Sequence, residues 1–330
     1  MPITFTHIYI ERGAERYPDT ELVLASYPDA VRVLIEDYKE VFNRAGQRFQ
    51  IQKKSPKLIL AVKKEHFLYL GSERIDSFGE ARIAYNSLIR NCLFNCDYCF
   101  LQGMHPSAFA LIYVNGEDFF PPVDEALAQG PLAVSISYVT DLLGFEGVLP
   151  LCRRWIEFAR GRTGLTVEIR TKSDNYTAIR DIEPTPNVAL TWTMSPEPLA
   201  ARYERGTASF KNRLFALRCA LDDGWRVRIC FDPLLHIEGW QELYAGCIDE
   251  IARRVDLNRV ERWSLGTLRM PAGYLKRITH DRQDSDILYA PFVVRHGDAA
   301  YPDEWDREMK ETVSAHLRRY VDERRITLVG

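Results

Sequence analysis

Three cysteines lie within eight residues of one another, Cys92, Cys96 and Cys99, with the spacing C-x3-C-x2-C. Thiolates this close on one loop can ligate three irons of a [4Fe–4S] cluster and leave the fourth iron without a protein ligand. An open iron can bind a small molecule through an amine and a carboxylate, as S-adenosylmethionine (SAM) does. Electron transfer from the cluster then splits the sulfonium and yields a 5′-deoxyadenosyl radical. The spacing therefore predicts radical chemistry in a site that excludes water.

Two other interpretations of the cysteines remain open. A structural zinc site needs a fourth ligand, for which His105, six residues after Cys99, is a candidate at an unusual spacing. Three buried, unreactive thiols are the second alternative. The flanking Tyr98 and Phe100 together with the spacing favour the cluster. The chain has seven cysteines, and this odd number argues against the disulfide framework of a secreted protein.

Composition narrows the class of protein. The 330 residues are 46% hydrophobic and 27% charged, which predicts a folded protein with a sizeable core. No apolar run reaches the roughly 18 residues of a membrane span, and the start lacks a basic region followed by an apolar stretch. We therefore expect a cytoplasmic protein that does not contact membranes. The net charge of −3 argues against non-specific coating of nucleic acid but leaves room for a local basic groove.

Strand-like and helix-like segments alternate along the chain. The segments predicted as strands are 57–62, 110–114, 132–136, 165–170, 188–193, 225–231 and 260–268. Those predicted as helices are 30–43, 149–159, 210–221, 240–252 and 303–322. This alternation predicts an α/β fold, a full or partial (β/α) barrel of the TIM type with sites at the C-terminal ends of its strands. A doubly wound sheet fits as well, but no Gly-rich phosphate fingerprint follows the first strand.

Several motifs resemble, in the same order, the spore photoproduct lyase family of the radical SAM superfamily. They are Ile8-Tyr9-Ile10-Glu11, Cys99-Phe100-Leu101-Gln102, Thr171-Lys172-Ser173, Arg202-Tyr203-Glu204-Arg205-Gly206-Thr207 and Asp232-Pro233-Leu234-Leu235-His236. The resemblance implies a partial (β/α)6 barrel over 85–270, with an N-terminal extension over 1–84 and a C-terminal extension with a final helix over 271–330. It implies a DNA lesion as substrate, two thymines joined by a methylene bridge. It also implies a reductant such as flavodoxin or ferredoxin; the oligomeric state stays open.

The resemblance assigns roles to individual residues. Cys92, Cys96 and Cys99 match the cluster ligands, and Lys172 matches a lysine that contacts the SAM carboxylate. Thr140 and Thr193 stand where the family has serines near SAM, and Ser195 is assigned to the same cofactor. Arg269 matches an arginine of a late strand that could face a phosphate, although a structural ion pair explains it equally well. Tyr203 and His236 are further candidates for contact with the substrate.

Two departures from the family concern hydrogen-atom transfer. In the family the deoxyadenosyl radical abstracts a hydrogen from the lesion, and a protein cysteine returns one. Tyr138 occupies the position of that cysteine, and Phe100 that of a relay tyrosine, whereas Tyr98 is retained. Three hypotheses follow: Tyr138 is the donor with Tyr98 nearby, Cys230 has taken over, or the reaction needs no returned hydrogen or acts on something else.

The substrate is the least determined feature. Basic residues with interleaved aromatics could follow a DNA backbone, or simply face water on helices: Arg153, Arg154, Arg160, Arg162, Arg202, Arg205, Lys211, Arg213, Arg226 and Arg228. The segment 288–298 has fewer glycines than the family and no lysine. A modified nucleoside, another small molecule or a protein remains an alternative substrate. A non-catalytic lesion-binding protein is the third alternative.

Overall fold

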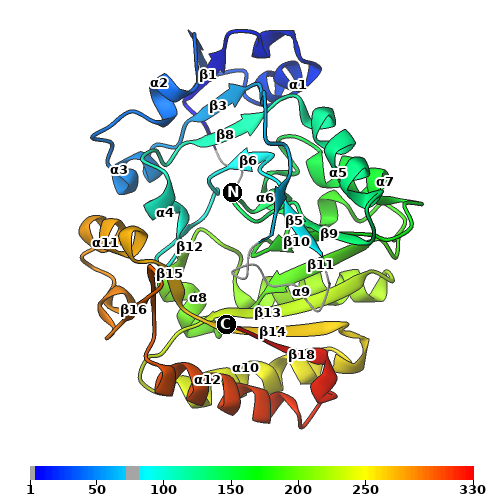
Figure 1. Cartoon of the computed structure of the whole chain (residues 1–330), viewed down its shortest axis with the longest axis vertical. Coiled ribbons are helices and arrows are strands. Elements are labelled where there is room, and N and C mark those ends of the chain that lie inside the picture. The colour runs from blue at the N-terminus through cyan, green and yellow to red at the C-terminus, as the bar shows by residue number, and fades with distance from the viewer. Residues whose placement is uncertain (1–3, 72–81) are drawn as a thin grey trace.

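The computed structural model describes residues 4–71 and 82–330. Its main feature is a curled sheet with helices on its outer side (Figure 1). Across the described residues the strands of this sheet run in the order β18 (Ile326–Val329), β14 (Arg262–Thr267), β13 (Arg226–Leu234), β11 (Val188–Thr193), β10 (Leu165–Thr171), β9 (Leu132–Ser135), β5 (Ile83–Tyr85) and β4 (Tyr69–Leu70). Neighbours from β18 to β5 are parallel, and only β4 runs antiparallel. The predicted partial barrel is confirmed.

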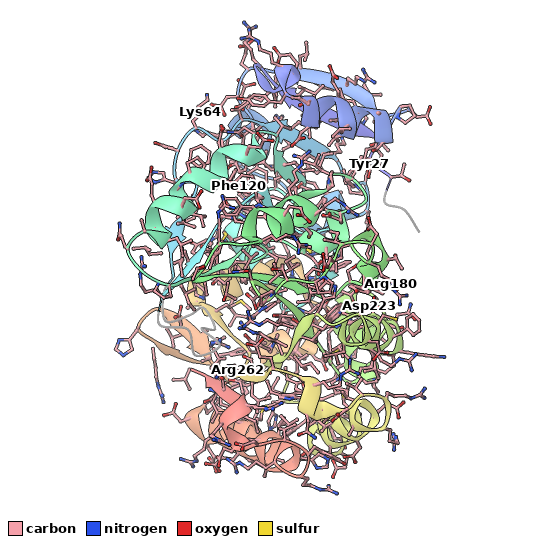
Figure 2. The ribbon with its side chains drawn as sticks, turned by 90° about the vertical axis from the view of Figure 1, so that its right-hand side faces the viewer. Tyr27, Lys64, Phe120, Arg180, Asp223 and Arg262 are labelled. Carbon is pink, nitrogen blue, oxygen red and sulfur yellow. The ribbon has the colours of Figure 1, made fainter. Side chains whose placement is uncertain are left out.

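Helices connect the parallel strands as predicted. They are α6 (Leu142–Phe145), α7 (Leu151–Ala159), α8 (Glu197–Tyr203), α9 (Phe210–Asp222), α10 (Trp240–Arg254) and α12 (Asp303–Leu317). Ser209 caps α9, because its side chain accepts a hydrogen bond from the Asn212 N–H at 3.2 Å. The outer faces carry surface ion pairs, such as the adjacent Arg180 and Asp223 (Figure 2).

A second, five-stranded sheet lies against the barrel, in the order β2 (Val31–Ile35), β1 (His7–Glu11), β3 (Leu58–Ala61), β8 (Ala110–Tyr113) and β6 (Ile89–Arg90). Its helices are α1 (Pro18–Ser26), α2 (Lys39–Phe42), α3 (Phe49–Lys53) and α5 (Phe120–Leu127). The predicted helix over 30–43 is wrong. Its first half forms β2, because the β-branched Val31, Val33 and Ile35 alternate in a strand paired with β1.

The remaining elements surround the cysteine segment. Short strands β7 (Asn95–Cys96) and β12 (Glu204–Arg205) pair antiparallel, and α4 (Leu101–Met104) packs on α11 (Ala272–Asp281). A three-stranded sheet is formed by β15 (Arg269–Pro271), β17 (Asp298–Ala300) and β16 (Val293–Arg295). The sheets interleave across the ranges proposed from sequence: β8 joins the N-terminal sheet and β18 joins the barrel. Those ranges stay a prediction as domain boundaries. Within the described ranges no helix is long and apolar enough to cross a membrane.

Candidate active site at the mouth of the barrel

The cysteine segment begins at the end of β6 and is fixed by buried side chains on its N-terminal side. Asn91 has a φ of +65° and is fully buried. Its amide nitrogen donates to the carbonyls of Ser107 and Phe109 at 2.7 and 2.8 Å. Lys53, at the end of α3, donates to the carbonyl of Cys92 at 2.5 Å. These contacts hold the backbone in a conformation that few residues other than glycine and asparagine adopt easily.

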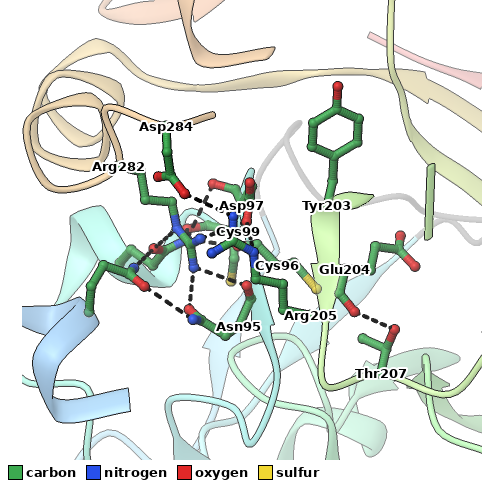
Figure 3. A network of polar contacts seen from close by, with 12 residues as sticks. Asn95, Cys96, Asp97, Cys99, Tyr203, Glu204, Arg205, Thr207, Arg282 and Asp284 are labelled. Atoms are coloured by element: carbon green, nitrogen blue, oxygen red, sulfur yellow. Dashed lines mark hydrogen bonds and ion pairs between the residues drawn. The ribbon is translucent and has the colours of Figure 1, made fainter. Parts of the chain in front are cut away.

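Arg282, directly after α11, holds the same segment from the C-terminal side (Figure 3). Its guanidinium, 1% exposed, donates to the Asp97 carboxylate at 2.6 Å and to the Asn95 carbonyl at 2.9 Å. It also donates to Gln102 at 2.7 Å, and Gln102 in turn donates to the carbonyl of Cys96 at 2.8 Å. A charged fork with several acceptors fixes orientation as well as position. The C-terminal region therefore holds the loop that carries the cysteines.

A second buried network lies behind Cys96, around Glu204. Its carboxylate accepts hydrogen bonds from Tyr98, from Arg213 and, at 2.7 Å, from Ser195. Burial alone would raise the pKa of Glu204, but the charges of Arg213 and Lys172 outweigh burial and hold that pKa below its ordinary value. The paired carboxylate is therefore ionised, which explains how a charge can be buried here.

The three thiols have the surroundings that a cluster needs. None is in a disulfide, and burial raises the pKa of each, that of Cys92 to about 12. Their charges act on one another, and Lys53 and Lys172 oppose this repulsion. Cys92, Cys96 and Cys99 are all free thiols on one segment, so each is available to bind a different iron of a cluster.

Across the mouth from the cysteines, the ends of β9 and β10 carry groups that lack protein partners. The Thr140 hydroxyl is buried without a hydrogen-bond partner in the described part of the chain. The Lys172 ammonium lies 5.5 Å from the centre of the Tyr98 ring, and its charge acts on Cys96 and Cys99. No described carboxylate pairs with it. SAM carries a carboxylate. If that carboxylate binds near the cluster, it would accept hydrogen bonds from both the Lys172 ammonium and the Thr140 hydroxyl.

Asp141 positions this side of the mouth. Its carboxylate accepts from the backbone N–H of Lys172 at 2.6 Å, from the Thr171 hydroxyl at 2.8 Å and from the Gly144 N–H at 3.0 Å. It thereby caps α6 and joins the end of β9 to the end of β10.

Tyr138 lies at the same mouth, half-buried, with its ring centre 5.8 Å from that of Phe100. Burial raises the pKa of its phenol, and the charges of Arg170, Arg269 and Asp232 act on it. Arg269 pairs with Asp232 at 3.0 Å, so the ion-pair alternative for this arginine is found in the structure. The predicted Cys230 is buried on β13, two residues before Asp232.

The other predicted residues divide into two groups. Thr193 is buried at the end of β11, and its carbonyl accepts from Arg213 at 3.0 Å, next to the Glu204 network. Tyr203 is 1% exposed and donates to Asp286 at 2.9 Å, whereas His236 stacks on Trp305 with 3.7 Å between ring centres. Both belong to packed contacts with the C-terminal region.

The basic groups proposed for DNA backbone contact are largely used inside the protein. Ion pairs join Arg153 to Asp181, Arg154 to Asp19, Arg160 to Glu157, Arg162 to Asp124, Arg202 to Asp286, Arg205 to Asp284, Arg213 to Glu204, and both Arg226 and Arg228 to Glu261. Lys211 is exposed. Most of these basic side chains therefore form ion pairs with carboxylates of the protein, several of them at the surface.

Three residues of the site were missed from sequence: Asp141, Glu204 and Arg282. Glu204 stood inside the quoted motif Arg202–Thr207, and Asp141 directly follows the candidate Thr140, so both charges were within reach of the sequence. Arg282 had none, because its partner Asp97 is 185 residues away.

Comparisons with known proteins agree with this geometry. A sequence model of the spore photoproduct lyase family matches residues 6–268. A spore photoproduct lyase of Geobacillus sp. (strain Y412MC61) is 22% identical over 248 residues, 71% of this chain and 72% of the relative. A solved mutant of spore photoproduct lyase superposes with a TM-score of 0.84 at 18% identity, over 100% of this chain and 99% of its own. A double mutant solved with AdoMet and dinucleoside spore photoproduct gives 0.82 over the same shares.

The family match covers most of the chain, and the cysteines, the barrel and the lysine at the end of β10 agree with it. The chain belongs to the spore photoproduct lyase family, a family of radical SAM lyases that use a [4Fe–4S] cluster and S-adenosylmethionine.

Proposed function

We propose that this protein repairs DNA by reversing a methylene-bridged thymine dimer, with Tyr138 as the residue that returns the hydrogen atom. When bound, the cluster and SAM supply the radical that removes a hydrogen from the lesion. The observation that carries the proposal is the position of Tyr138: it follows β9 at the mouth of the barrel, at the sequence position to which the resemblance assigns the donor cysteine.

The chain's own residues have separate tasks in this reaction. Cys92, Cys96 and Cys99 bind the cluster, while Lys172 and Thr140 bind the carboxylate and polar end of SAM. Tyr138 gives its phenolic hydrogen to the carbon radical left on the methyl group of the opened lesion. A phenol O–H can be given as a hydrogen atom, and the phenyl ring of Phe100 has none to give. The half-buried phenol keeps its proton at neutral pH, because burial raises its pKa.

Deuterium labelling tests the proposal directly. The protein is reconstituted anaerobically with iron and sulfide, given SAM and a reductant, and incubated in D2O with the lesion dinucleotide. A phenol or thiol exchanges its hydrogen with solvent, whereas a C–H bond does not. We expect 5′-deoxyadenosine, restored thymines and one deuterium in each restored methyl group, measured by chromatography and mass spectrometry.

Two variants separate the candidate donors. Tyr138→Phe should still form 5′-deoxyadenosine but restore thymines at least about tenfold more slowly, because the reactive O–H is gone. Cys230→Ala should behave as wild type, and Tyr9→Phe, a half-buried tyrosine of the N-terminal sheet, is the matched control. Deuterium transfer that is lost in Cys230→Ala and kept in Tyr138→Phe would assign the donor to the thiol. Only background 5′-deoxyadenosine from protein with a full cluster would show that the substrate is a different one.

A further inference from the structure

Tyr138 is one end of a row of tyrosine rings that leads away from the cysteines. The centres of the Tyr138 and Tyr85 rings are 4.8 Å apart with 51° between their planes. The Tyr85 and Tyr69 rings are 5.0 Å apart with 17° between their planes, so they stack. Rings this close are in van der Waals contact, which gives good electronic coupling from one ring to the next.

The sheet register places Tyr69 beside Tyr85, and the turn that follows β9 brings Tyr138 to Tyr85. Tyr69 on β4 lies directly opposite Tyr85 on β5, and Tyr85 lies opposite Ser135 on β9, three residues before Tyr138. Side chains at opposed positions point to the same face of a sheet. The phenols also act on one another: after burial, Tyr85 raises the pKa of Tyr138, and Tyr69 raises that of Tyr85.

The far end of the row reaches solvent. Tyr69 is half-buried, and its hydroxyl accepts a hydrogen bond from the Lys63 ammonium at 3.1 Å. Lys63 is 6% exposed and also lies over the Tyr113 ring, so it holds Tyr69 in place. Beyond Tyr69 follows His66, whose side chain is 69% exposed. A small reductant in solution can therefore approach this end, while Tyr138 stays inside the mouth.

The opposite direction, toward the cysteines, is blocked for a hydrogen atom. The ring that neighbours Tyr138 there is Phe100, which follows Cys99 and has no O–H. A Tyr138 radical therefore has exchangeable phenols on one side only.

We propose that Tyr85 and Tyr69 form a radical-transfer path that restores Tyr138 after each turnover with a hydrogen atom from an external thiol. This inference rests on the proposed role of Tyr138. The Tyr138 O–H breaks as the substrate C–H forms. The Tyr85 O–H then breaks as that of Tyr138 re-forms, and Tyr69 restores Tyr85 in the same way. A low-molecular-weight thiol gives its hydrogen to Tyr69, and two thiyl radicals join to one disulfide. Each turnover releases one 5′-deoxyadenosine, which keeps the hydrogen taken from the lesion.

The test compares the first turnover with the following ones. Wild type, Tyr85→Phe, Tyr69→Phe and the control Tyr9→Phe are given excess lesion dinucleotide, SAM and dithiothreitol, and restored thymines are followed in time. The path predicts a normal first equivalent in both path variants, followed by a rate at least about tenfold below wild type. Samples of Tyr85→Phe frozen after the first equivalent should hold a tyrosyl radical signal in electron paramagnetic resonance. Wild type without dithiothreitol should also stop restoring thymines after the first equivalent.

The outcomes separate this inference from the proposed function. If Tyr85→Phe and Tyr69→Phe both restore thymines at the wild-type rate in the first and in later turnovers, the path is wrong, and Tyr138 stays the donor. If Tyr138→Phe restores thymines at the wild-type rate, Tyr138 is not the hydrogen donor. Unfolding temperatures control for a packing effect. A variant that unfolds at a lower temperature than wild type, and that also fails to restore the first equivalent of thymines, has lost structure. In that case wild type without thiol decides, because it withholds the hydrogen-atom source and leaves the structure unchanged.

Discussion

The two sides of the barrel mouth differ in how their polar groups are satisfied. On the cysteine side, Glu204 and Arg282 are at most 2% exposed, and each makes several charged hydrogen bonds within the protein. On the side of β9 and β10, the Thr140 hydroxyl has no described partner, and the Lys172 ammonium has no described carboxylate. Apart from the three free thiols, the first side is held by charged groups that are paired within the protein, whereas the second side has binding capacity left. Substitutions on the first side should therefore affect folding and the cluster, and those on the second should affect ligands.

The largest effect is expected for Arg282→Met. This change leaves the Asp97 carboxylate buried without its main cation, a loss that typically costs about 3–5 kcal/mol. We expect reconstituted protein with clearly less iron and sulfide per chain and a lower free energy of unfolding in urea. Arg202→Met removes an ion pair at a side chain that is 62% exposed and should cost at most about 1 kcal/mol. Equal losses in the two variants would contradict the comparison.

Lys172→Met comes next and should act mainly on the ligand, because Arg213 still pairs with Glu204 and Lys53 still acts on Cys92 and Cys99. Hydrogen bonds to charged groups contribute about 1.5–3 kcal/mol, so SAM binding should weaken by roughly 10–100-fold. Equilibrium dialysis of the reconstituted protein measures this dissociation constant, and iron content should stay at the wild-type level. Lys211→Met, an exposed lysine of α9, is the matched control. Loss of the cluster in Lys172→Met would place this lysine with the scaffold.

Tyr98→Phe and Tyr138→Phe each remove a phenolic oxygen, the first on the cysteine side of the mouth and the second on the side of β9 and β10. The Tyr98 hydroxyl donates to the buried Glu204, so its removal should lower the free energy of unfolding by about 0.5–1.5 kcal/mol. The change at Tyr138 should stay within about 0.5 kcal/mol in folding while thymine restoration falls. For both proteins, denaturant unfolding measures the free energy of unfolding, and the product assay measures the rate of thymine restoration. Identical stability profiles would show that the sides do not differ.

Thr140→Val should have the smallest effect and an unusual sign. Removing a buried hydroxyl that lacks a partner is neutral or slightly favourable for folding without SAM. Binding of SAM should weaken severalfold, corresponding to about 0.5–1.5 kcal/mol for one hydrogen bond. Thermal unfolding with and without SAM measures both effects, since a bound ligand stabilises the protein by mass action. A destabilised protein without SAM would mean that the hydroxyl already has a partner.

Local and long-range contacts also differ in how well they could be predicted from the sequence. Short-range signals sufficed for the cysteine spacing and the parallel strands, because each depends on neighbouring residues. Partners far apart in the chain were not visible, such as Arg282 with Asp97 or Tyr69 with Tyr85 and Tyr138. The arginines between 153 and 228 suggested nucleic acid, yet most of their carboxylate partners come from other segments; Arg160, which pairs with Glu157 in its own helix, is an exception. At β2, a plausible helical pattern was overridden by pairing with a neighbouring strand.

The sequence separation of 185 between Asp97 and Arg282 also sets an order of events on the ribosome. At roughly 5–20 residues per second, about ten seconds or more pass between synthesis of the cysteine segment and synthesis of the arginine that anchors it. During that interval the nascent loop lacks its C-terminal anchor. The loop that carries the cysteines can therefore reach its final conformation only after α11 and Arg282 have been synthesised.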